Sequence, residues 1–166
     1  MEPKFVNYVE YTKETLQEAF FNTIGKPLVV WGSIILPITI LLLITSRDFS
    51  LTTVLLLVIA VTSIFMGIYM PRITAKQEYE RNKINSSGEA PSKITFSFFD
   101  DCIKSNEQPI NVDTTYNYSQ IQKIKSTKNL YILQFNKSIF IITSKNSFTT
   151  GTAEEFEAFM KEKIKK

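Results

Sequence analysis

Two long apolar runs occupy the middle of the chain, and a single pair of charged residues separates them. No charged residue occurs in Pro27–Ser46 or in Phe49–Pro71, whereas Arg47 and Asp48 lie between these runs. About 20 residues of helix cross a hydrocarbon layer roughly 30 Å thick. Each run is therefore long enough to cross a membrane.

One continuous helix over residues 27–71 would be roughly 65 Å long and would bury both charges at its centre, at about 2.5 to 3.5 kcal/mol each. A turn at Arg47 and Asp48 avoids that cost. The pattern therefore predicts transmembrane helices at 27–46 and 49–71, joined by a short extracytoplasmic turn at 47–48, with Pro71 ending the second helix. Two helices buried in a soluble protein, or a cleaved signal peptide, explain the pattern less well, because the runs have few polar faces and follow a long polar leader.

Basic residues near the apolar runs predict the orientation of the hairpin. Lysines precede the first run, and Arg72, Lys76, Arg81 and Lys83 follow the second, whereas the turn offers only Arg47. By the positive-inside rule, both termini face the cytoplasm of a cell membrane. The single cysteine, Cys102, excludes an internal disulfide and agrees with that location.

The leader, residues 1–26, combines a strand pattern with a helix pattern. Residues 4–11, KFVNYVEY, are rich in aromatic and β-branched types and predict a strand. Thr12 is typical of a helix N-cap, and Gly25-Lys26-Pro27 is expected to end that helix. After the hairpin, residues 72–92 predict a juxtamembrane helix that gives way to a Ser/Gly/Pro linker.

From Lys93 the apolar period changes to two, which predicts a small antiparallel β domain over residues 93–166. We expect five or six strands, with a turn at Asp100-Asp101, a hairpin region around Ser105–Pro109 and a two-residue turn at Asn136-Lys137. Thr152 to Glu155 form a capping box, and an apolar stripe follows it, so a terminal helix should cover one side of the sheet. The fold class predicted is α+β, joined to a membrane hairpin.

Residues that carry catalytic chemistry are scarce. The chain has no histidine, so a Ser-His or Cys-His pair is excluded, and its glycines form no phosphate-binding loop. Asp100 and Asp101 are adjacent and would point to opposite faces of a strand. Their charge should raise the pKa of Cys102, which we expect to be a small core residue. The sequence therefore predicts no catalytic residue, no metal site and no cofactor.

Basic residues are the remaining candidates for a site. Arg72 and Lys76 could contact anionic headgroups, although a solvated helix explains them as well. Lys123, Lys125 and Lys128, with an aromatic neighbour, resemble a phosphate-binding patch, but they also fit the solvated side of an amphipathic strand. These five residues are the candidates for contact with lipid or a protein partner, although a solvated helix and a solvated strand face explain them better, and we expect no nucleic-acid partner.

Three short motifs in the β domain are Tyr118, Ile121 and Ile124 in YSQIQKI, residues 128–133 in KNLYIL, and Lys145 with Phe148 in KNSF. These motifs resemble the YcxB-like family of small bacterial membrane proteins. Tyr118 stands where the family often has Trp, and Ser144 stands where it often has Pro. The order of the parts resembles the family over nearly the whole chain. The resemblance implies a C-terminal domain similar to pleckstrin-homology-like (PH-like) folds and implies no assigned activity.

Two classes of function fit these features. The first is a membrane-anchored, non-enzymatic module that presents a cytosolic PH-like domain to a protein partner through a sheet edge or the terminal helix. The second is a small membrane regulator, a transport accessory or a bacteriocin self-immunity protein that acts through its hairpin. Gly32-x-x-x-Leu36 and Ser63-x-x-x-Gly67 give only a weak signal for contacts between spans, and assembly into a homo-oligomer stays open.

Overall fold

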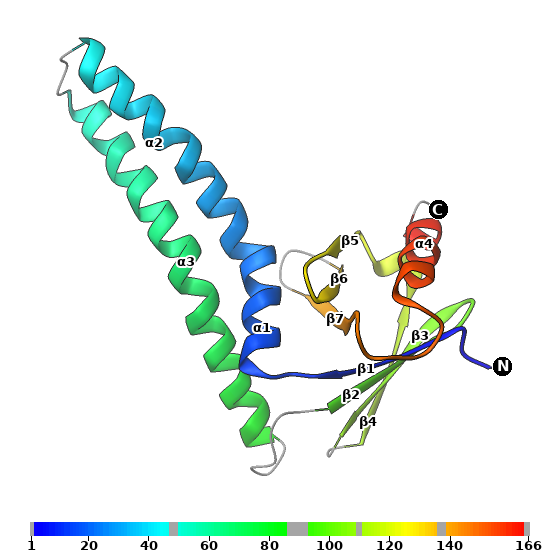
Figure 1. Cartoon of the computed structure of the whole chain (residues 1–166). Coiled ribbons are helices and arrows are strands. Elements are labelled where there is room, and N and C mark those ends of the chain that lie inside the picture. Colours follow the sequence, from blue (N-terminus) through cyan, green and yellow to red (C-terminus); the bar gives the residue numbers. More distant parts are fainter. Residues whose placement is uncertain (1, 47–49, 86–92, 109–110, 136–138, 165–166) are drawn as a thin grey trace. The chain divides into compact units, whose positions relative to one another are not determined.

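The chain divides into two compact units in the computed structural model (Figure 1). Met1–Ala19 and Glu78–Lys166 form one unit, and Phe20–Gln77 forms the other. The structure describes residues 2–46, 50–85, 93–108, 111–135 and 139–164, so the predicted turns at 47–48 and 136–137 lie outside the described residues. The division of the chain into six segments, from the leader at 1–26 to the β domain at 93–166, stays a prediction. The elements are β1 (Phe5–Glu10), α1 (Lys13–Phe20), the π-helical turn η1 (Phe21–Gly25), α2 (Lys26–Ser46), α3 (Leu51–Asn85), β2 (Lys93–Phe98), β3 (Cys102–Gln108), β4 (Val112–Asn117), the 3₁₀ turn η2 (Tyr118–Gln120), β5 (Lys123–Ser126), β6 (Leu130–Gln134), β7 (Phe140–Ser144), β8 (Phe148–Thr150) and α4 (Ala153–Ile164).

The larger sheet, sheet A, has five antiparallel strands in the order β4-β3-β2-β1-β8. Its β1 comes from the leader and pairs with β2 from Phe5↔Phe98 to Glu10↔Lys93. The predicted leader strand is therefore confirmed, and the structure places it inside sheet A. Thr12 then caps α1, because the Thr15 N–H donates to its Oγ1 at 3.1 Å.

The hairpin predicted around Ser105–Pro109 is present between β3 and β4, but its turn comes later than predicted, because β3 continues through Ser105 to Gln108. Every residue of β2 has a partner in β3, and Ile103 and Ser105 alternate into the core, so the strand has no reason to end early. The chain reverses before β4, where Asn111 has φ +50°, a conformation that Asn tolerates better than most residues. The turn predicted at Asp100-Asp101 is confirmed between β2 and β3.

The smaller sheet, sheet B, has the order β5-β6-β7. Its central strand β6 is buried on both faces, with Ile132 and Leu133 fully inaccessible. Seven strands follow Lys93 in the described part of the chain, where the sequence predicted five or six. The prediction missed β8, because three residues are too few to show an alternating pattern.

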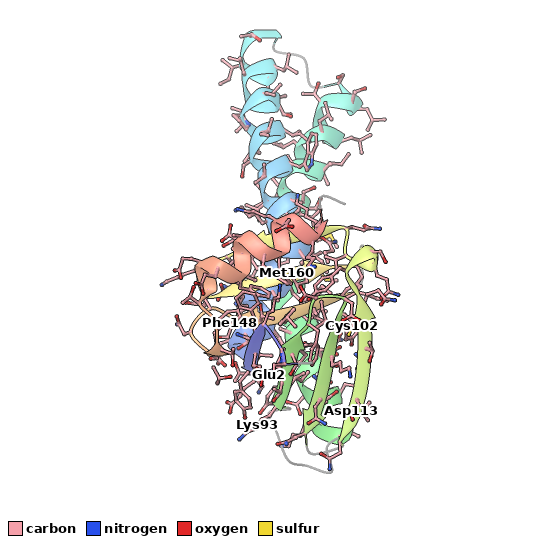
Figure 2. All side chains as sticks on the ribbon, turned by 90° about the vertical axis from the view of Figure 1, so that its right-hand side faces the viewer. Glu2, Lys93, Cys102, Asp113, Phe148 and Met160 are labelled. Carbon is pink, nitrogen blue, oxygen red and sulfur yellow. The ribbon has the colours of Figure 1, made fainter. Side chains whose placement is uncertain are left out.

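Helix α4 packs an aromatic side chain between the two sheets. The predicted capping box is confirmed: the Thr152 N–H donates to Glu155 Oε2 at 3.0 Å, and the Glu155 N–H donates to Thr152 Oγ1 at 3.3 Å. Phe156 and Met160 are fully buried, and Met160 lies on the side of α4 that faces the sheets (Figure 2). The Phe156 ring contacts the rings of Phe98 at 4.7 Å, Phe148 at 5.0 Å, Tyr131 at 5.5 Å and Phe5 at 5.6 Å.

Two long apolar helical segments make up most of the second unit, and their ends at residues 13–19 and 78–84 belong to the first unit. Lys13–Thr45 and Leu51–Ile84 each include an 18-residue window of mean hydropathy 2.5, long and apolar enough to cross a membrane. The end predicted at Gly25-Lys26-Pro27 is wrong, because the Lys26 N–H donates to the Phe21 carbonyl and the helix continues into α2. Pro27 is tolerated there because it comes directly after the turn, where a missing N–H costs little.

The stop predicted at Pro71 is also wrong, because α3 runs through it to Asn85. Proline has no N–H, so the Gly67 carbonyl, four residues earlier, loses its usual helical donor. That carbonyl lies against Gly25, where an added Cβ would be only 2.4 Å from its oxygen. Because Gly25 has no side chain, it packs closely against α3 at the point where Pro71 interrupts the helical hydrogen bonds.

Small residues join the two helices at intervals of seven. Gly25 faces Gly67, and Gly32 faces Ala60, where an added Cβ on Gly32 would be 2.8 Å from the Ala60 carbonyl oxygen. Thr39, seven residues after Gly32, is 1% exposed and turns its hydroxyl back to the Ile35 carbonyl. Gly32 and Gly67, named in the sequence, therefore lie in the contact, but the repeat is the seven-residue period of a left-handed helix pair and not the spacing of four.

Candidate interaction site

The three predicted lysines lie on β5 and in the turn that follows it. Lys123 and Lys128 are exposed, and Lys123 pairs in register with Gln134. Lys125 is half-buried and lies beside Ile132, which is fully inaccessible. The amphipathic pattern had suggested that the lysine face of β5 is fully solvated. The structure shows instead that Lys125, unlike Lys123, is partly covered.

Two distant side chains fix the β5–β6 turn that carries Lys128. Glu18 of α1 accepts hydrogen bonds from the Thr127 hydroxyl at 2.6 Å, the Asn129 N–H at 2.9 Å and the Asn129 side chain at 2.8 Å. On the other side, Lys145 Nζ donates to Ser126 Oγ at 2.8 Å and to the Thr127 carbonyl at 2.5 Å. The turn is thus held in one shape, with Lys128 at its exposed tip.

The same hydrogen bonds change the acidity of Glu18. Burial raises the pKa of its carboxyl, but the hydrogen bonds from Thr127 and Asn129 and the charge of Lys128 outweigh burial. The net pKa lies below the ordinary value of 4.5, so the carboxylate is ionised at neutral pH. The sequence did not predict Glu18 or Lys145 as site residues, since their partners are far away along the chain.

A polar groove of about 470 Å³ lies beside this turn. Glu10, Glu14 and Glu18 contribute carboxylates to it, and Glu10 also pairs with Lys93 at 3.7 Å. Its other lining residues are Tyr8, Val9, Thr12, Thr15, Asn129, Leu130, Ser144 and Ser147. Its carboxylates can accept hydrogen bonds, and its hydroxyls can donate or accept them.

Arg72 and Lys76 belong to the helical unit, whereas the three lysines belong to the β-rich unit. Both side chains are exposed on α3, and the Arg72 guanidinium carbon lies 5.8 Å from the centre of the Tyr69 ring. This cation–π contact leaves the guanidinium free to meet water or headgroups. Contact of these five basic residues with lipid or a partner stays a prediction.

A second cluster of charges, which the sequence did not indicate, surrounds Asp100. Lys4 Nζ lies 2.6 Å from its carboxylate, and Lys163 Nζ donates to its main-chain carbonyl at 2.7 Å. Both ammonium groups also lie within 6 Å of the Phe159 ring centre, at 5.8 and 5.2 Å. The hydrogen bond from Lys4, with the charge of Lys163, holds the pKa of Asp100 below its usual range. Three separate parts of the chain meet here, so no local spacing could have revealed the cluster.

Cys102 is half-buried at the start of β3 and is not the core residue predicted. Its neighbour on the strand, Ile103, takes the core position because strand side chains alternate. Desolvation, followed by the hydrogen bond and charge of Asp101, raises the pKa of the thiol, as predicted. Within the described ranges, no three Cys, Asp or Glu side chains gather closely enough to hold a metal ion.

The structure thus defines an α+β protein with antiparallel sheets and two long apolar helices. Residues 107–160 match the model of the YcxB-like protein family, which confirms the resemblance over that segment. The segment includes all of sheet B, β4 and β8 of sheet A, and the first two turns of α4. The comparisons with curated proteins and with solved structures found no match.

The residues on which the resemblance rests have structural roles. Ile121 is 4% exposed, and the Tyr118 hydroxyl donates to the Phe99 carbonyl at 2.6 Å. Lys145 fixes the β5–β6 turn and lies 4.8 Å from the Tyr131 ring centre. The residues shared with the family therefore stabilise the fold of this domain.

Proposed function

We propose that the protein is a membrane-anchored, non-enzymatic interaction module whose cytosolic domain presents a binding surface to a protein partner. The observation that carries the anchor is the exposure of the two apolar segments. Only 11% and 17% of their most apolar windows are buried within the protein. Trp31, Leu41, Ile44 and Leu51 are each more than 60% exposed.

Such exposure is costly in water and favourable in lipid. Each large apolar side chain gains about 1.5 to 3 kcal/mol when it leaves water, and apolar residues surround both helices on all sides. A core helix of a soluble protein would instead be mostly buried. In a helix the backbone groups are paired internally, so the hydrocarbon layer does not penalise them.

The proposed topology is a two-span hairpin with both termini in the cytoplasm. The basic residues before Pro27 and after Pro71 support this orientation by the positive-inside rule. The single cysteine is a native probe of this topology, because Cys102 is only partly buried and lies in the β-rich unit.

The anchor and its orientation are tested together by thiol labelling in membranes. The protein should stay with the membrane in alkaline carbonate, and a membrane-impermeant maleimide should label Cys102 in inverted vesicles but not in intact cells. Ser50→Cys in a Cys102→Ser background should show the opposite pattern. Release by carbonate would contradict the anchor, and labelling of Cys102 in intact cells would contradict the orientation.

Three features support an interaction module. Sheets A and B with α4 support a PH-like arrangement, since α4 packs Phe156 between the sheets. Sheet edges and the terminal helix are surfaces that proteins commonly bind. The rigid β5–β6 turn, with Lys128 at its tip, and the adjacent polar groove add a surface of mixed charge.

An anchor exchange separates this proposal from a function of the hairpin itself. The unit Phe20–Gln77 is replaced by an unrelated two-span hairpin, while residues 1–19 and 78–166 are kept so that β1 stays with its sheet. Proteins that co-purify with the exchanged chain and with the full chain in mild detergent are compared. A shared partner, lost when the groove carries Glu14→Lys, is the expected result. Partners that follow the native hairpin instead would contradict the module.

A further inference from the structure

Strand β4 forms an exposed edge of sheet A. It pairs with β3 on one side and stands last in the strand order (Figure 1). Val112, Asp113, Thr114, Thr115 and Asn117 are all exposed, and Figure 2 shows Asp113 on this outermost strand. We propose that β4 is the surface through which two copies of this chain pair, antiparallel and about a two-fold axis at Thr114. The inference concerns the β-rich unit and does not rest on the membrane proposal.

The edge has fewer protective features than the other exposed strands. Proteins protect exposed strands with lysine, proline, bulges or short length. Edge strand β5 carries Lys123 and Lys125, and edge strand β8 has only three residues. By contrast, β4 has six residues with no lysine, proline or glycine, and its register with β3 is unbroken. Its one charge, Asp113, accepts a hydrogen bond from Asn106 Nδ2 at 2.8 Å.

The sequence of β4 is complementary to itself in this register. A two-fold axis at Thr114 places this residue opposite Thr114 of the second copy. Opposed residues then lie on the same face of the extended sheet, as antiparallel pairing requires. Val112 then lies opposite Tyr116 of the second copy. Val112 is 48% exposed, and the Tyr116 ring already contacts Phe135 at 5.2 Å, so each copy would cover an apolar side chain of the other.

Charge favours a second copy as the occupant. Lys104 lies beside Thr115 within one chain, and Thr115 would lie opposite Asp113 of the second copy. Lys104 and that aspartate therefore share a cross-strand row, about 10 Å apart at the backbone. Glu107 lies beside Val112, so its row ends on Tyr116 and Ile103 of the second copy. The two-fold arrangement thus places opposite charges in one cross-strand row and apposes no like charges.

Disulfide trapping of the full chain in membranes or mild detergent tests the register. In a Cys102→Ser background, Thr114→Cys should form a dimer on mild oxidation, because opposed residues on the axis have Cα atoms about 4.5 to 5.5 Å apart. Thr115→Cys is the matched control: its copies lie beyond the 7 Å limit for a disulfide and should stay monomeric. Equal dimer from both positions, no dimer from Thr114→Cys, or a bond from it only to another protein would each overturn the proposal.

A substitution without cysteine provides an independent readout. Thr114→Lys would place two ammonium groups directly opposite each other, so the dimer fraction measured by analytical ultracentrifugation of the full chain should fall at least tenfold. Thr149→Lys makes the same change on the exposed opposite edge, β8, and should leave that fraction unchanged. Thermal unfolding checks that both variants fold. A folded Thr114→Lys variant that dimerises like the parent would overturn the proposal.

Discussion

At the scale of single residues, Glu18 shows how one side chain joins distant segments. Its carboxylate satisfies one hydroxyl, one backbone N–H and one amide, all in the turn before β6. A charged acceptor of this kind contributes more than a neutral one, because the donors remain partly shielded from water. The helix α1 is thereby attached to sheet B by a bond that spans more than a hundred residues of sequence.

This attachment predicts a pH dependence. The pKa of Glu18 is lower in the folded state than its ordinary value of 4.5, so its contribution is present above that value and is lost as the pH falls through the folded-state pKa. Glu18→Gln should lower stability at pH 7 by about 1 kcal/mol, after allowance for partial exposure, and should reduce the loss of stability below pH 4.5. Thermal unfolding of the detergent-solubilised protein between pH 7 and pH 3 measures both effects.

Glu14→Gln, one turn earlier on α1 and in the same groove, is the control. This exposed substitution should change stability by less than about 0.5 kcal/mol at pH 7. An unchanged acid dependence in Glu18→Gln would show that other carboxyls, such as Asp100 and Glu157, account for it.

At the scale of elements, the contact between α2 and α3 depends on the absence of side chains. An added Cβ at Gly32 would be 2.6 Å from Ile64 Cγ1 and 2.8 Å from a backbone oxygen. The backbone oxygen cannot move without shifting α3. Small residues at every seventh position therefore set how closely the two helices approach.

Gly32→Leu should separate these helices and destabilise the hairpin by about 1 to 3 kcal/mol, as overpacking usually does. Ser33→Leu, the next residue along, is exposed and should have little effect. Loss of helical circular dichroism on heating in detergent, together with the fluorescence of Trp31, compares the two variants. Equal melting temperatures would show that Gly32 does not limit the approach.

At the scale of the whole β-rich unit, strand β1 is the connection between both sheets. Asn7 is fully buried; its Nδ2 donates to the Ser144 carbonyl at 2.7 Å, and its Oδ1 accepts the Ser144 N–H at 2.9 Å. One side chain thus acts as a strand would, joining β1 of sheet A to β7 of sheet B. The N-terminal segment is therefore an integral part of a domain whose other strands follow the hairpin.

Asn7→Ala should cost about 2 to 3 kcal/mol, because it leaves two partly buried backbone groups of Ser144 without the hydrogen bonds from Asn7. Hydrogen exchange should show the same event locally, as faster exchange of the Ser144 amide. Asn106→Ala makes the same change on the outer face of sheet A and should cost less than about 1 kcal/mol. Retained protection of Ser144 in Asn7→Ala would contradict the role given to Asn7.

The sequence determined the features that depend on near neighbours. Alternation at Ile94, Phe96 and Phe98 predicted β2, and the capping box at Thr152 predicted α4, because hydrogen bonds and side-chain faces within one element follow a fixed period. The two apolar runs were evident for the same reason. Basic residues of the candidate site could be named, but their pairing could not.

Tertiary structure alone decided the features that depend on residues far apart in the chain. Helix α3 passes through Pro71 because Gly25 on another helix leaves room, and the helix continues past Pro27 because η1 replaces the expected stop. Glu18, Asn7 and Asp100 acquire their roles from partners on other elements. Local pattern records which face of an element is apolar, whereas packing chooses what that face meets, and this second choice carries no signature in sequence spacing.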